Sequence, residues 1–254
     1  MKSCAILTLF LATIGAVTAA RGERLTVAVS TPQVQITSNF AGVTVTTFGV
    51  IEGADSLSVI EGYQVAVVVI GPAQTVVARR KDRVLGIWAN RATETIIAAP
   101  SFYALDTSGP LETLAPPATL ARLGLGFANL GLSFAGGGSD GAEQTEFQAA
   151  FVRLQAQAGL YTAATNVQFI GDTIFRSNTF VPANIPDGRY TVLAYLFSQQ
   201  SLIAAAQSSF TVSKIGFEQT VASFAVGQSL IYGVLTVALS IFIGWLGGVI
   251  FRRD

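Results

Sequence analysis

The sequence predicts a mainly β protein: an immunoglobulin-like β-sandwich with a helical insertion, followed by one C-terminal transmembrane helix. Short runs rich in Val, Ile, Thr and aromatic residues recur before residue 106 and again from residue 167 to 212, and Gly, Pro, Asn or Asp separate most of them. Tyr190 enters a late run just after the turn residues Pro186-Asp187-Gly188, as a tyrosine does in the penultimate strand of such sandwiches. An uncharged stretch of 22 residues, 230–251, stands near the end of the chain.

The first half of the chain is expected to form short strands. These are Leu25–Val29, Val34–Thr37, Val43–Ile51, Gln64–Ile70, Thr75–Ala78 and Phe102–Leu105. The run Val65–Ile70 is continuously apolar, which predicts a central strand covered on both faces. Gly71-Pro72 ends this strand, and Thr75–Ala78 is expected to return beside it as a hairpin partner.

A helical insertion is predicted near residues 111–160. Pro116-Pro117 opens a short helix with Leu120 and Leu123 on one face, and Gly124 ends it. Asp140 and Glu143 have capping-box spacing ahead of a second helix, which Gly159 is placed to stop. Its apolar stripe at i, i+4, i+7 and i+11 consists of Phe147, Phe151, Leu154 and Ala158.

Strands are predicted to resume at Val167–Ile170, Thr173–Thr179, Arg189–Phe197 and Leu202–Val212. The sandwich domain then occupies residues 21–215, with enough chain for a real core. Two small sandwiches divided by the helices are the alternative arrangement.

The N-terminus has the layout of a removable export signal, residues 1–20. Lys2 gives a positive start, residues 5–17 are apolar, and Thr18-Ala19-Ala20 forms a small-residue cleavage site. The apolar part is shorter than the roughly 20 residues that span a bilayer, which argues against the alternative of an uncleaved anchor.

The apolar stretch 230–251 would measure about 33 Å as a helix, enough to cross a bilayer core, and this argues against a buried core helix. Arg252 and Arg253 follow, so the positive-inside rule leaves residues 252–254 in the cytoplasm and the large domain outside. Residues 216–229 form an amphipathic juxtamembrane segment. Gly244 and Gly248 have the GxxxG spacing of a helix-packing face.

The composition excludes several functions. Fifteen basic and fifteen acidic residues balance, so no global charge favours nucleic acid. The chain has no histidine, and its one cysteine, Cys4, lies in the expected signal. We therefore expect no zinc, copper, haem or iron–sulfur cofactor and no Cys- or His-based catalysis. Oxygen-only sites for calcium or magnesium stay open, although no residues are assigned to a metal. The absence of a glycosylation sequon and of a disulfide favours a bacterial periplasm, with the helix in the inner membrane.

A run of basic residues is the best candidate for a functional surface. Five of the fifteen basic residues lie close together: Arg79, Arg80, Lys81, Arg83 and Arg91. On a strand, Arg79, Lys81 and Arg83 share one face, while Arg80 and Asp82 share the other. Such a segment could bind an anionic ligand, a lipid head group or an acidic partner. The alternative is a solvated edge strand that its charges protect from aggregation. The nearby aromatics Trp88, Phe102 and Tyr103 are expected to be core.

Two function classes remain. A tethered β-sandwich without metal or nucleophile chemistry predicts a non-enzymatic accessory or interaction protein in contact with the lipid bilayer. The alternative is an envelope hydrolase or transferase that uses two carboxylates about 5–10 Å apart across a cleft.

The chain resembles the alphaproteobacterial transmembrane protein family Alph_Pro_TM along essentially the whole mature sequence. The resemblance rests on the runs 79–91, 100–103, 38–40, 122–125, 159–161, 216–219 and 244–254. Ile70-Gly71-Pro72 departs from it, because an arginine is expected before Gly-Pro. The resemblance implies an envelope location, the order of signal, domain and anchor, and an accessory role beside a sulfite exporter-like permease.

Overall fold

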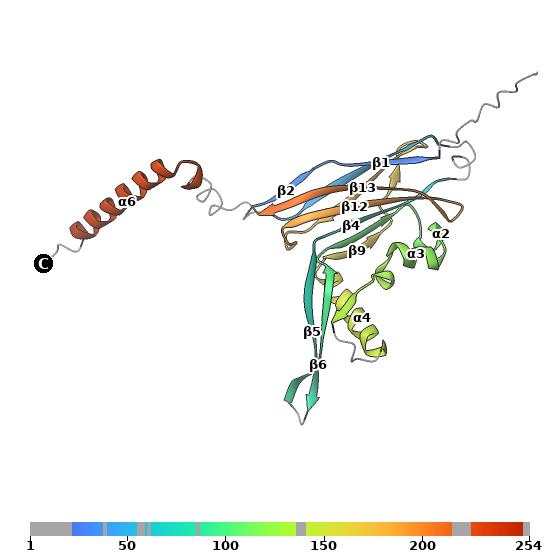
Figure 1. The fold of residues 1–254 in the computed structure, drawn as a ribbon, viewed down its shortest axis with the longest axis horizontal. Helices are drawn as coiled ribbons and strands as arrows, with labels where there is room; N and C mark the ends of the chain where they lie inside the picture. The colour runs from blue at the N-terminus through green and yellow to red at the C-terminus, as the bar shows by residue number, and fades with distance from the viewer. Residues whose placement is uncertain are drawn as a thin grey trace, which may run out of the picture.

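The computed structural model describes residues 22–37, 40–54, 59, 62–84, 87–135, 141–214 and 225–250, with the side chains of 81–92 and 142 left out. The expected signal 1–20 and cytoplasmic end 252–254 lie outside these residues. Figure 1 shows three parts: a β-sandwich, an arm that projects from it beside the inserted helices, and a separate C-terminal helix.

The sandwich consists of two sheets. The first has the order β1 (Arg24–Val29), β3 (Val43–Glu52), β11 (Ile174–Val181) and β10 (Gln168–Phe169), all antiparallel. The second has the order β2 (Gln33–Ile36), β13 (Ser201–Lys214), β12 (Gly188–Ser198), β4 (Gln64–Ile70), β7 (Tyr103–Thr107) and β9 (Tyr161–Ala164).

The strand order is that of an immunoglobulin domain. The first sheet reproduces the order A-B-E-D, and β13-β12-β4-β7 reproduces G-F-C with an added C′ strand. Tyr190 completes the match: it enters β12, it is fully buried, and its hydroxyl donates a 2.7 Å hydrogen bond to the carbonyl of Pro186. This is the tyrosine corner of such domains. The predicted fold is confirmed, as one sandwich rather than two.

Strand β4 lies between two hydrophobic cores. Its alternate side chains Val65, Val67 and Val69 join the core between the two sheets. Ala66 and Val68 point to the other face and join a second core under the insertion. Because successive side chains of a strand point to opposite faces, a strand covered on both sides must be apolar throughout. The prediction for Val65–Ile70 is confirmed.

The insertion that follows β7 covers the second face of the larger sheet. It comprises α2 (Leu111–Leu114), α3 (Pro117–Leu123), the 3-10 turn η1 (Phe127–Asn129), β8 (Ser133–Ala135) and α4 (Gly141–Gln157). Gly124 ends α3 in the left-handed conformation, as predicted. The hydroxyl of Tyr103 on β7 donates to the carbonyl of Gly124 and accepts from the amide of Gly126, which ties the insertion to the sheet.

The arm is a long hairpin that the sequence analysis assigned wrongly. Residues 75–78 do not pair with β4; they belong to β5 (Ala73–Val84), which pairs antiparallel with β6 (Ile87–Pro100). Strand β8 adds to β6 at Thr95–Ile97, so the arm is a three-stranded sheet in which β5 is an edge. The β4 edges are already taken by β7 and β12, which leaves the following segment no place in the larger sheet.

The C-terminal helix α6 spans Ser229–Ile250, against the predicted 230–251. It is long and apolar enough to cross a membrane, and none of its 22 residues is buried. Figure 1 shows it lying apart from the sandwich. Most of the expected juxtamembrane segment 216–229 lies outside the described residues.

Candidate functional site

The structure places the predicted basic segment on the arm. Arg79, Arg80, Lys81 and Arg83 lie on β5, and Arg91 lies on β6. Arg80 pairs with Ala92 and Lys81 with Asn90, so Arg91 is the extra residue of a β-bulge. Beyond Arg80 the side chains are outside the described set, so the facing of Lys81, Arg83 and Arg91 stays a prediction.

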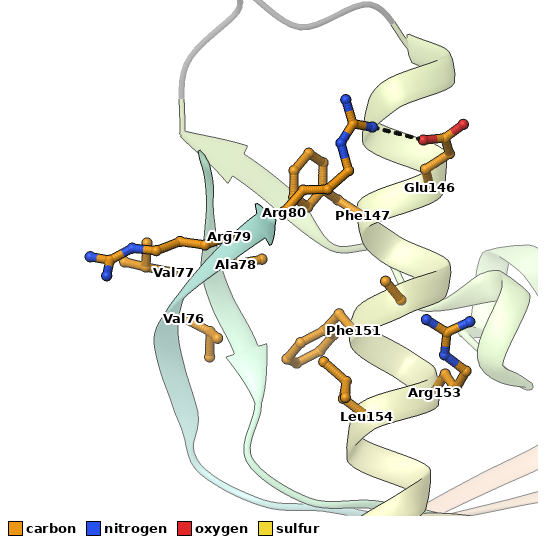
Figure 2. A pocket seen from close by; sticks show the side chains of 11 residues that line it. Val76, Val77, Ala78, Arg79, Arg80, Glu146, Phe147, Phe151, Arg153 and Leu154 are labelled. Carbon is orange, nitrogen blue, oxygen red and sulfur yellow. Dashed lines mark hydrogen bonds and ion pairs between the residues drawn. The ribbon is translucent and has the colours of Figure 1, made fainter. Parts of the chain in front are cut away.

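Arg79 and Arg80 point to opposite faces of the arm, as expected for neighbours on a strand (Figure 2). Arg80 turns toward α4, where its guanidinium lies 3.2 Å from the Glu143 carboxylate and 3.1 Å from that of Glu146. It also lies 6.0 Å from the centre of the Phe147 ring. Arg79 points away, and no ion pair joins it to another residue in the described part of the chain. Both side chains are exposed, but Arg80 contacts α4, whereas Arg79 lies on the opposite face of the arm.

A groove of about 510 Å³ runs between β5 and α4. One wall is five consecutive residues of β5, Val76–Arg80, and the other is the α4 face that carries Phe147, Phe151 and Leu154 (Figure 2). Phe147 and Phe151 are buried, as predicted, but Leu154 is 60% exposed although the sequence pattern assigned it to the core. Leu154 is exposed because α4 leaves the sheet face open along the β5 edge.

The other predicted residues are placed as follows. Phe102 and Tyr103 are buried core residues, as expected, while the Trp88 side chain lies outside the described set. Gly244 and Gly248 lie on α6, and a Cβ added at either would meet no atom within 4 Å. No described part of the chain therefore packs against the helix surface at these two glycines.

Asp106 on β7 is the buried carboxyl of the described residues. One of its oxygens accepts hydrogen bonds from Ser177 at 2.8 Å and Thr179 at 2.6 Å, and the other accepts from Asn166 at 3.3 Å. Burial raises the pKa of this carboxyl above its usual value, and the three hydrogen bonds oppose the shift only in part. No second buried carboxyl faces it in the described part of the chain, and none of the groove-lining residues contacts it. Asp106 joins the two sheets of the sandwich.

The raised pKa of Asp106 gives a pH-dependent stability with a definite sign. The folded state binds the Asp106 proton more tightly than the unfolded state does, so this group stabilises folding at low pH. That stability is lost as pH rises through the folded pKa. Asp106→Asn keeps an acceptor for Ser177 and Thr179 and removes the titration. We expect the free energy of unfolding of the variant, relative to that of wild type, to increase from pH 4 to pH 7.5, as measured by urea denaturation at each pH. An advantage that is constant or shrinks with pH would contradict the assignment.

The groove was missed in the sequence because it joins distant segments. The sequence assigned Glu143 only to a helix start and assigned Glu146 no role, and nothing in it indicates that Arg80 meets them. The available signal was indirect: the apolar stripe of α4 continues to Leu154, further than one sheet face needs.

Within the described residues, the fold and the apolar helix α6 define a β-sandwich protein with one candidate membrane-spanning segment. A family model described as "Putative transmembrane protein (Alph_Pro_TM)" matches residues 24–253. The chain belongs to this family.

Comparison with curated proteins gives no match. Among solved structures, the chain is similar to AggA, the major subunit of aggregative adherence fimbriae type I from Escherichia coli. The two share 12% identity, and the match covers 76% of this chain and 95% of that chain, with a TM-score of 0.25. At this TM-score the similarity carries nothing about function.

Proposed function

We propose that the protein is a non-enzymatic accessory protein, anchored in a bacterial inner membrane with its sandwich in the periplasm, which acts by binding another membrane protein. A transporter of the sulfite exporter-like permease class is the proposed partner. The observation that carries this proposal is the arm. It projects from the sandwich and leaves an apolar-lined groove open along β5. It also presents Arg79, which makes no ion pair with any residue whose side chain is described. Exposed apolar surface of this kind is typical of interaction sites.

The described residues support binding rather than catalysis. The groove is lined mainly by Val, Ala, Phe and Leu, and the acidic group in it, Glu146, is already paired with Arg80. A two-carboxylate mechanism requires a second carboxyl across a cleft. Asp106 has no such neighbour among the described buried residues, and its oxygens are held by Ser177, Thr179 and Asn166.

The proposed orientation makes an all-or-none prediction. A reporter enzyme that is active only in the periplasm should work when it is fused after Ile215, because the sandwich is exported. The same reporter fused after Asp254 should be inactive, because Arg252 and Arg253 retain the end in the cytoplasm. The opposite pattern of activities would overturn the proposed location.

The partner proposal is tested at Arg79. A photo-crosslinking amino acid at position 79 of the full chain, activated in native membranes, should give a discrete product that contains a multi-span membrane protein. In a second experiment without the crosslinker, Arg79→Glu should lower the amount of the same protein that co-purifies with the chain severalfold. The difference from wild type should shrink as the salt concentration rises, because exposed charges are screened over about 8–10 Å.

The matched control is Arg122→Glu, which reverses an exposed arginine on α3, outside the arm. It should leave recovery unchanged. Arg80→Glu is not an equivalent test, because it also breaks the contacts with Glu143 and Glu146. Recovery of only monomeric chain from several mild detergents, with no crosslink at position 79, would contradict the proposal.

A further inference from the structure

Strand β5 has one edge to which no described strand is paired. The arm has the order β5-β6-β8, so the amides and carbonyls on the outer side of β5 have no ladder partner there. The groove beside α4 is lined by consecutive residues Val76–Arg80, as expected where a strand edge itself forms the wall. The bulge near the base of the arm lies in β6, where two residues separate Ile96 from Ala99 while only Thr75 separates their partners on β5. The β5 edge is therefore regular.

The two halves of this edge differ in chemistry. Residues Ala73–Ala78 read Ala-Gln-Thr-Val-Val-Ala and carry no charge, whereas Arg79–Arg83 carry four cations and one anion. Edge strands of soluble proteins are usually protected by charge, proline or bulges, and a neutral β-branched edge is prone to pair with another strand. Val77 is 50% exposed on the face away from α4. The neutral half is thus a pairing surface that the described chain does not cover.

The charge pattern favours a second copy of the same strand. In an antiparallel pair related by a two-fold axis at Val77, Thr75 of each copy lies opposite Arg79 of the other. With the axis at Ala78, Thr75 lies opposite Lys81 and Val77 opposite Arg79. In both registers every cation of one copy faces a neutral residue of the other. With the axis at Val77 the two Arg79 residues are four positions apart along the strands, so the basic halves do not repel across the pair. With the axis at Ala78 the two Arg79 residues are diagonal neighbours, and their repulsion disfavours that register. An interface with two-fold symmetry pairs the same surface of both copies, so it gives a dimer and does not continue into a longer assembly.

The C-terminal helix α6 independently favours a second copy of the chain as the partner of the β5 edge. Two copies held by α6 in one bilayer meet at a high effective concentration. Gly244 and Gly248 leave space on α6 for the close approach of another helix. Self-association through the helices and through the arms would reinforce each other.

We infer that two copies of this protein pair antiparallel through the β5 edges of their arms and form one continuous six-stranded sheet from two three-stranded ones. This inference is independent of the proposed transporter partner. The two-fold axis is perpendicular to the joined sheet, so both α4 helices lie on the same face. The two β5–α4 grooves then merge into one channel between the helices, lined twice by Ala78, Phe151 and Leu154.

The experiment is a charge exchange at Thr75, an exposed residue on the neutral half. The full chain is reconstituted in lipid nanodiscs, and its oligomeric state is followed by native mass spectrometry over a range of protein-to-disc ratios. Wild type should be dimeric. Thr75→Glu places a carboxylate opposite Arg79 or Lys81 of the second copy and should strengthen the dimer, while Thr75→Lys should weaken it. The dissociation constants of the two variants should differ by tenfold or more, because each substitution acts twice in a two-fold pair.

The matched control is the same pair of changes at Thr162, which is exposed on β9 of the sandwich and lies outside the arm. Glu and Lys at position 162 should give the same dimer stability. Spin labels report the register in a Cys4→Ser background. Labels at position 77 should lie within about 20 Å of each other, and labels at position 83 roughly 33–40 Å apart.

Three results would overturn the inference. The first is a monomeric wild type at all ratios. The second is a dimer that responds equally to Glu and Lys at position 75, which would assign the contact to α6 alone. The third is a monomer whose yield of another crosslinked protein follows the charge at position 75, which would assign the β5 edge to that protein. The transporter proposal fails separately, on the absence of its own crosslink from position 79.

Discussion

Gly49→Ala is expected to destabilise the sandwich by about 3 kcal/mol, among the largest effects of any single methyl group in this protein. Gly49 lies in the middle of β3, directly opposite Phe175 of β11, and both face the core between the sheets. A Cβ at Gly49 would overlap the Phe175 ring, which is fully buried and packs edge-on against Phe169. The ring has no open space to move into, so the strands must separate. Urea denaturation of the detergent-solubilised chain measures the loss.

A second substitution tests the cause. Phe175→Leu removes the ring and should cost about 1–2 kcal/mol by itself. Gly49→Ala should add little in that background, so the two changes should be strongly non-additive. Gly131→Ala is the control, since a Cβ there meets nothing within 4 Å, and it should change stability by no more than about 0.5 kcal/mol. Additive costs at positions 49 and 175 would show that ring overlap is not the reason for the glycine.

Phe151→Ala is expected to cost about 3–4 kcal/mol and to release α4 from the arm and the sheet. Phe151 is 5% exposed and packs perpendicular to Tyr161 with ring centres 5.7 Å apart. It also lines the groove beside β5 (Figure 2). Its removal leaves a cavity where helix, arm and sheet meet. Hydrogen exchange should show faster exchange of the α4 amides, while the amides of β3 and β11 keep their protection.

Leu154→Ala is the matched control on the same helix. Leu154 lies three residues further along the same face but is 60% exposed, so its truncation should change stability by no more than about 0.5 kcal/mol. Equal losses at positions 151 and 154 would mean that Leu154 is covered in the native protein. Such a result in membranes, but not in dilute detergent, would agree with a second copy over the groove.

The sandwich could be predicted because its signals are local. The continuous apolar run of β4 is enough by itself to predict a strand covered on both faces. The turn followed by Tyr190 is likewise a local pattern, because the Tyr190 hydroxyl bonds to Pro186, only four residues earlier. The insertion was equally legible, since Pro117 and Gly124 bound α3 by their own backbone preferences.

The arm could not be predicted for a related reason. Residues 79–98 contain seven charged side chains and alternate poorly, so they lack the half-buried pattern that identifies a strand. They are extended because β5 and β6 pair with each other, and among those of these residues whose side chains are described, Ile96 near the base is the one that is fully buried. The candidate site on the arm could be predicted only in part for the same reason. Arg79 and Arg80 could be identified by their charge, but which of them contacts α4 depends on a helix that begins some sixty residues later.

The placement of β4 between two hydrophobic cores has a consequence for how the protein responds to damage. Val67 contributes to one core and Val68 to the other, so a shift of this strand by one residue would exchange both sets at once. The insertion is therefore not a detachable module grafted onto an independent sandwich. Without the insertion, the larger sheet would expose an apolar, aggregation-prone face that includes Ala66, Val68 and Phe197. In the wild type, sandwich and insertion should melt as one cooperative unit, from which Phe151→Ala releases only α4. Strand β4 also connects the base of the arm to the tyrosine corner, because Ile70 at its end pairs with Thr191 beside Tyr190.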